Sequence, residues 1–137
     1  MLSGLPPAAN HRCHKSIKLL LRCEMDEEHE LEVLLSLDGF EFQFAEGYLV
    51  RIAAQLVETT SARPHGIKYS LTLHDPAGVR IYGIDNAHGV RRRRADFDHR
   101  HVYGRRRVIP YTYKGPIELL EDFYREVERI LRERGVR

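Results

Sequence analysis

The strongest constraint on the fold is an alternation of apolar and polar residues over positions 67–83, interrupted once by a turn. Every second residue from Ile67 to Leu73 is apolar, which is the pattern of a strand that buries one face. The next five residues, His-Asp-Pro-Ala-Gly, favour a turn, and the alternation resumes at Val79. The sequence therefore predicts an antiparallel hairpin that ends next to Asp85, where a rigid sheet can hold functional side chains.

The C-terminal segment has the other clear pattern, that of an amphipathic helix beginning after Gly115. Pro116 occupies the first turn, where proline is tolerated. Acidic residues lead and arginines trail along the segment, as the helix dipole prefers. The apolar residues that share one helical face are Leu120, Phe123, Val127, Ile130 and Leu131. We expect this helix to cover one face of the sheet.

The remaining segments are expected to supply further strands. Phenylalanines alternate with polar residues over 40–44, the segment 48–59 is expected to be extended, and 108–113 is expected to hold a last short strand. Two interpretations stay open for 24–37, because alternating apolar residues favour a strand whereas the composition favours a helix. Residues 90–107 show neither period and are expected to form a long basic loop.

These patterns predict one α+β domain, an antiparallel sheet of about five strands with a C-terminal amphipathic helix packed on one face. The domain is expected to span 16–137, after a flexible tail at 1–15. The chain does not open with a basic region followed by an apolar core, and its apolar runs are too short to span a membrane. We therefore expect a cytoplasmic protein with no membrane partner.

The formal net charge of +2 hides a strong asymmetry. Residues 88–107 contain eight arginines against two aspartates, a local charge of +6, so the rest of the chain is acidic. A concentrated basic segment on an otherwise acidic protein produces a directional field. This distribution favours an anionic partner at that segment.

Two histidines in this basic segment are candidates for chemistry. On an extended backbone, His99 and His101 project to the same side, with Arg100 opposite. If the segment folds back on the hairpin, His88 and Asp85 can join them. The pattern is compatible with three kinds of chemistry.

In the first, the histidines act as general acid and general base in phosphodiester cleavage, because the pKa of imidazole lies near neutrality. Asp85 or Asp98 would orient one imidazole, and arginines would neutralise the charge on the phosphate. This chemistry requires no cofactor. In the second, His99 and His101 bind a divalent metal together with His88 or Asp85, and the metal activates a water.

In the third, the protein grips nucleic acid without catalysis, using the 88–107 basic loop. The arginines would contact phosphates, and Tyr103 would stack on a base. Tyr111 and Tyr113 are also available for stacking, although a place in or beside a strand is the simpler role for both.

The sequence contains Tyr-Gly-Ile-Asp-Asn-Ala-His-Gly at 82–89, followed by His-Arg-His at 99–101. These two motifs in this order resemble the TumE family, toxins of bacterial and archaeal toxin–antitoxin modules, and the resemblance extends from about residue 48 to 131. The connection between the two motifs is longer here, because residues 91–94 add four arginines. The positions that match the family pattern are Lys68, Tyr69, Tyr82, Asp85, Asn86, His88, Gly89, His99 and His101.

The resemblance implies a growth-inhibiting toxin that is neutralised by a cognate helix-turn-helix antitoxin. Together with the basic segment, it leads to the hypothesis of a His-dependent ribonuclease, and the alternative is a non-catalytic nucleic-acid-binding protein. No cofactor is required, a divalent metal is possible, and a homo-oligomer is possible. The candidate catalytic residues are His88, His99, His101 and Asp85, which are also the ligands if a metal is present. The candidate RNA contacts are Arg91, Arg92, Arg93, Arg94, Arg100, Tyr103 and Lys68.

Overall fold

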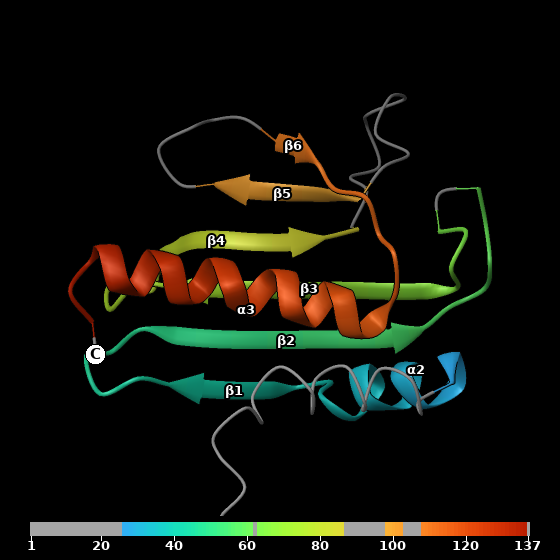
Figure 1. Ribbon diagram of the computed structural model, residues 1–137, viewed down its shortest axis with the longest axis horizontal. Coiled ribbons are helices and arrows are strands. Elements are labelled where there is room, and N and C mark those ends of the chain that lie inside the picture. The colour runs from blue at the N-terminus through green and yellow to red at the C-terminus, as the bar shows by residue number, and fades with distance from the viewer. Residues whose placement is uncertain (1–25, 62, 87–97, 103–107, 137) are drawn as a thin grey trace, which may run out of the picture.

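The computed structural model describes residues 26–61, 63–86, 98–102 and 108–136 (Figure 1). Within these residues the chain forms one antiparallel sheet in which every strand pairs with its neighbour in sequence, in the order β1-β2-β3-β4-β5-β6. The elements are α2 (Glu27–Ser36), β1 (Phe40–Gln43), β2 (Leu49–Leu56), β3 (Ile67–His74), β4 (Arg80–Asp85), β5 (His99–Val102), β6 (Val108–Pro110) and α3 (Pro116–Glu133). The α+β prediction is confirmed, and the sheet has six strands where about five were expected.

The predicted hairpin is the centre of the sheet. Its strands β3 and β4 pair antiparallel, with Ser70 opposite Asp85 at one end. Asp75 closes the turn, because its Oδ1 accepts hydrogen bonds from the backbone N–H groups of Ala77 and Val79, each at 2.9 Å. The positive φ of 82° at Gly78 suits a residue without a Cβ. The local turn chemistry therefore sets the register that places Asp85.

Helix α3 lies across one face of the sheet, as Figure 1 shows. Tyr82 of β4 stacks on Phe123 of α3 with ring centroids 5.8 Å apart. Helix α2 contacts both α3 and β2 and contributes the fully buried Leu34. The other large buried residues of this layer include Val50, Ile52, Tyr69, Leu71, Leu73, Ile84, Leu119 and Val127. We call this side of the sheet the helix face.

The segment 24–37, for which strand and helix stayed open, contains helix α2. Asp26 caps the helix, because its side chain accepts a hydrogen bond from the backbone N–H of His29 at 2.9 Å. Three glutamates in the first turn also suit the helix dipole. Capping and composition therefore outweigh the alternation of apolar residues.

The prediction of a loop throughout 90–107 is wrong for 99–102, which form strand β5. This strand pairs with β4 on one side and β6 on the other. Its charged residues are accommodated because alternate side chains go to opposite faces, where Asp85 meets the two histidines and Tyr111 meets Arg100. Residues 1–15, the expected tail, lie outside the described residues. Neither of the helices in the described ranges is long and apolar enough to cross a membrane.

Candidate functional site

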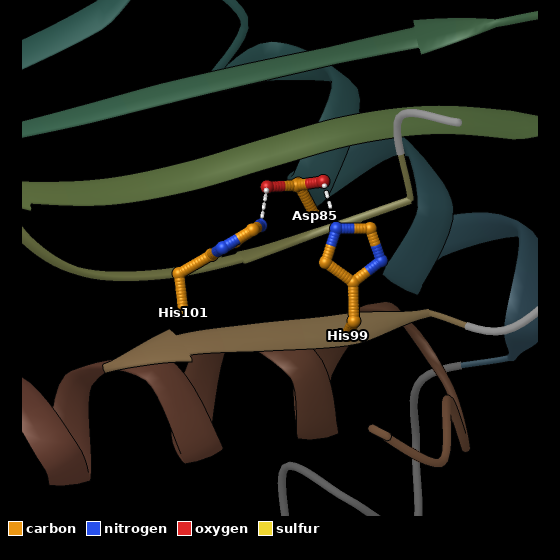
Figure 2. A group of neighbouring side chains, drawn as sticks. All are labelled: Asp85, His99 and His101. Carbon is orange, nitrogen blue, oxygen red and sulfur yellow. Dashed lines mark ion pairs between the residues drawn. The ribbon is translucent and has the colours of Figure 1, made fainter. Parts of the chain in front are cut away.

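Asp85, His99 and His101 meet on the side of the sheet opposite the helix face, and Figure 2 shows their side chains converging. Asp85 ends β4 and stands opposite His99 of β5, while His101 follows two residues along the same strand. The Nε2 atom of His99 lies 2.9 Å from Asp85 Oδ1, and that of His101 lies 3.1 Å from Asp85 Oδ2. We call this group the Asp-His-His cluster and its side of the sheet the site face.

The cluster is graded from buried to accessible. The exposed fraction of the side chain is 7% for Asp85, 12% for His99 and 28% for His101. The two imidazole rings are 4.7 Å apart and nearly perpendicular. The cluster is therefore most accessible to solvent at His101 and least accessible at the carboxylate.

Arg80 reaches the cluster because β4 contains a bulge. Leu73 pairs with Tyr82 whereas His74 pairs with Arg80, so β4 has one extra residue at this point. The Arg80 side chain extends along the site face, and its Nη1 lies 3.7 Å from Asp85 Oδ2. A cation with a partly exposed side chain therefore stands beside the buried carboxylate.

Gly83 leaves room on this part of the site face for groups of neighbouring residues. It lies between Thr72 of β3 and His101 of β5 in the sheet register. A Cβ at this position would lie 3.1 Å from Leu71 O, 3.3 Å from Thr72 Cγ2 and 3.7 Å from Arg80 Cδ. The glycine thus lets neighbouring strands and the Arg80 side chain approach closely.

The surroundings favour a neutral His101. Burial lowers the pKa of His101 below its ordinary value, and the guanidinium of Arg80 lowers it further. The Asp85 carboxylate raises that pKa, but His99 lowers it as well, and the net effect is a lowered pKa. A neutral imidazole keeps a nitrogen lone pair, which can accept a proton or bind a metal ion.

Asn86 holds the end of β4 in place. Its side-chain Oδ1 accepts a hydrogen bond from Tyr69 N at 3.0 Å, and its Nδ2 donates one to Ile67 O at 2.7 Å. The side chain is buried and satisfies two backbone groups of β3. Its role is therefore to fix the strand end that carries Asp85.

Asp98 anchors the start of β5. Its Oδ2 accepts a hydrogen bond from Tyr69 Oη at 2.6 Å, and its backbone oxygen accepts one from Tyr111 N at 2.7 Å. Burial and the bond to Asp98 raise the pKa of Tyr69, so the phenol stays the donor. Of the two aspartates proposed to orient an imidazole, Asp85 is the one whose carboxylate contacts both rings.

The model of the family described as Toxin TumE matches residues 17–131. The chain belongs to the TumE toxin family. Comparison with curated proteins gives no match, and comparison with solved structures gives none either. The family makes this chain the toxin component of a toxin–antitoxin system and implies an antitoxin partner. The matched range contains the whole sheet, including the Asp-His-His cluster of this TumE-family toxin.

Arg100 lies on the helix face of the TumE-family sheet, away from the cluster. It alternates with His99 and His101 along β5 and therefore points the other way. Its guanidinium carbon is 4.9 Å from the centroid of the Tyr111 ring, a cation–π distance. The Tyr111 hydroxyl in turn donates to Asp122 of α3 at 3.0 Å. Arg100 is thus not among the side chains that the structure brings to the cluster.

The site face carries two further cations, Lys68 and Arg80, of which the sequence predicted only the first as a site residue. Lys68, a predicted contact, is exposed on β3, two residues along the strand from Ser70, which pairs with Asp85. Arg80 was missed, because a bulge rather than a motif turns it toward Asp85. The predicted residues that lie outside the described residues are His88, Arg91, Arg92, Arg93, Arg94 and Tyr103.

The cluster offers two kinds of chemistry to this TumE-family toxin. Its imidazoles can transfer protons, with Asp85 orienting them. Its nitrogens and carboxylate oxygen can also bind a metal, because one ligand atom from each of the three residues lies within 4.8 Å of the others. Both kinds of chemistry suit the cleavage of a phosphodiester.

Proposed function

We propose that this TumE-family toxin inhibits growth in the cytoplasm by cleaving RNA, with Asp85, His99 and His101 as its catalytic residues. The observation that carries the proposal is the convergence of two imidazoles on one buried carboxylate, at Nε2–O distances of 2.9 Å and 3.1 Å. Rigid paired strands hold all three side chains, so the arrangement is preorganised. Such a group can handle the protons of a phosphodiester reaction or hold an ion that does so.

The charge of the site face supports an anionic substrate. Arg80 lies beside the cluster, and Lys68 is exposed on the next strand of the hairpin. Arg51 of β2 stands opposite Thr72 and thus on the same face, where it pairs with Glu41. These cations share the face of the sheet that carries the Asp-His-His cluster, where they can contact a phosphate backbone.

RNA cleavage by the purified toxin tests the proposal. Wild type is incubated with total cellular RNA, both with chelator and with added divalent metals. We expect cleavage, and we expect His99→Ala and His101→Ala each to lower its rate by about 100-fold or more. Both variants should still bind RNA, because the cations of the site face remain.

The matched control is His29→Ala on helix α2. His29 also forms a histidine–aspartate pair, with Nδ1 2.7 Å from Asp26 Oδ1, but both side chains are 68% exposed. Its removal should leave cleavage unchanged. If wild type cleaves no RNA under any metal condition yet binds RNA with a strong salt dependence, the protein is a non-catalytic RNA-binding toxin and the proposal fails.

The antitoxin partner is proposed to carry a helix-turn-helix domain. The family supports an antitoxin, and the neighbouring reading frame tests its type. Co-expression of a small helix-turn-helix protein encoded there should restore growth to cells that express the toxin. An adjacent frame of another class that restores growth would contradict this part of the proposal.

A further inference from the structure

We infer that the Asp-His-His cluster is a binding site for one divalent transition-metal ion, with Asp85, His99 and His101 as its three protein ligands. The use of that ion in RNA cleavage rests on the proposed function, whereas its binding does not. The proposal decides between the two kinds of chemistry that the cluster offers. It makes the histidines ligands rather than a separate acid and base.

The contact distances fit a shared ion. Bonds of about 2.0 to 2.2 Å put neighbouring ligand atoms about 2.8 to 3.1 Å apart at octahedral angles and about 3.3 to 3.6 Å apart at tetrahedral angles. The Nε2 atoms of His99 and His101 lie 2.9 Å and 3.1 Å from the two oxygens of Asp85. Each imidazole nitrogen therefore lies at such a spacing from a carboxylate oxygen, and one ligand atom from each of the three residues lies within 4.8 Å of the others.

The orientation of the rings also favours ligands over a separate acid and base. An acid and a base that act directly on a phosphodiester present their nitrogens to two different oxygens of the substrate. Here the distal nitrogens of both rings turn inward to the same carboxylate, as Figure 2 shows. Convergence on one carboxylate brings the three donor groups close enough to share a single ion.

The donor types narrow the ion to a class. Two imidazole nitrogens and one carboxylate oxygen suit first-row ions such as Zn²⁺ and Mn²⁺, whereas Mg²⁺ and Ca²⁺ prefer oxygen ligands throughout. The described part of the chain supplies three ligands, the number found in catalytic zinc sites, where water or substrate completes the shell. The graded burial, from 7% exposed at Asp85 to 28% at His101, places those positions toward solvent.

Metal binding by the full chain, purified without a histidine tag, tests the inference. Metal-free protein is titrated with Zn²⁺, Mn²⁺ or Co²⁺ alone in a calorimeter, and bound metal is quantified by elemental analysis. We expect one ion per chain and, with Co²⁺, visible absorption bands that report nitrogen and oxygen ligands. The ion should also raise the Tm, because it binds the folded state.

Ligand variants locate the ion. Asp85→Asn and His101→Gln should each weaken binding by about 100-fold or more, since loss of a mere supporting residue already costs 10- to 100-fold in typical sites. His101→Gln is the safer variant for folding, because His101 is the most exposed of the three. Circular dichroism checks that each variant is folded. His29→Ala should bind the ion like wild type, which would show that the exposed pair of His29 and Asp26 is not the binding site.

The outcomes separate this inference from the proposed function. If no ion binds more tightly than about 1 mM, or if the ligand variants bind as wild type does, the metal site is wrong. RNA cleavage by metal-free protein that still needs His99 and His101 would then leave the proposed function standing. Stoichiometric binding that the variants abolish supports the metal site, even if the protein cleaves no RNA.

Discussion

The two faces of strand β5 carry similar residue types and use them differently. On the helix face, the Asp98 carboxylate accepts a hydrogen bond from Tyr69, and Arg100 lies over the ring of Tyr111. On the site face, His99 and His101 both contact the carboxylate of Asp85. Asp98 and Arg100 thus anchor the strand, whereas His99 and His101 are available for chemistry. The period-2 alternation of the strand makes the division.

The two faces of β5 differ in the role of the residues that contact them. The partners on the helix face belong to the packed layer, since Tyr69 and Tyr111 are 2% and 5% exposed. They hold β5 against the rest of the fold. On the site face the partners are themselves candidate catalytic groups, with Arg80 beside them. Residue type alone therefore does not separate a structural charge from a functional one, whereas the face of the strand does.

The largest effect is expected from Tyr69→Phe, which breaks the anchor of β5 without touching the site face. The substitution removes the donor to Asp98, so a buried carboxylate loses its hydrogen bond. Hydrogen bonds to charged groups contribute about 1.5 to 3 kcal/mol, and urea denaturation should show a loss of this size in the free energy of unfolding. RNA cleavage at low temperature should stay within about threefold of wild type, because the Asp-His-His cluster remains.

A different result for Tyr69→Phe would break the comparison. If the variant keeps its stability but loses cleavage as fully as His99→Ala does, Tyr69 belongs to the site and the two faces are not independent. Asp98→Asn is the companion variant, because it keeps an acceptor for the phenol while removing the charge. It should lose less stability than Tyr69→Phe.

The middle effect is expected from Arg80→Met, which removes a cation from the site face. RNA cleavage should fall by about tenfold. The slope of the logarithm of the RNA association constant against the logarithm of the salt concentration should become less negative by about 0.7, the value for one lost phosphate contact on a single strand. Metal affinity should rise by about two- to fivefold, because Arg80 no longer competes for Asp85 across a partly exposed ion pair. Calorimetry and an RNA-binding assay at several salt concentrations measure both. A parallel loss of metal and RNA binding would show that Arg80 merely supports the fold.

The sequence predicted the elements whose local signals agree with one another. The hairpin has both an alternation and a turn in which Asp75 bonds the backbone, and the helix α3 has both an apolar face and a favourable charge order. The segment 24–37 stayed open because its two signals conflict. Strand β5 was missed as a strand because its four residues, His-Arg-His-Val, do not alternate between apolar and polar types. Its extended form is visible only in the pairing with β4 and β6.

The same distinction applies to the candidate site. The motifs at 82–89 and 99–101 singled out Asp85, His99 and His101, and the alternation placed the two histidines on one side. Arg80 could not be found in this way, because the bulge that redirects it depends on the pairing of β3 with β4. The sequence also could not tell Asp98 from Asp85 as the partner of the imidazoles. That choice depends on which face of the neighbouring strand each carboxylate meets.

The smallest effect is expected from Arg100→Met, the same substitution on the opposite face of the sheet. A cation–π contact of this kind contributes about 0.5 to 2 kcal/mol, and methionine keeps most of the apolar contact with Tyr111. The free energy of unfolding should therefore fall by about 1 kcal/mol or less, while RNA cleavage and its salt dependence stay as in wild type. Comparison with Arg80→Met shows whether RNA binding depends on the total charge of the protein or on the face of the sheet that carries the charge. An equal loss of RNA binding in both would mean that Arg100 turns toward the phosphate when RNA binds. A loss confined to Arg80→Met would locate RNA on the site face, because both variants remove one arginine from the same protein.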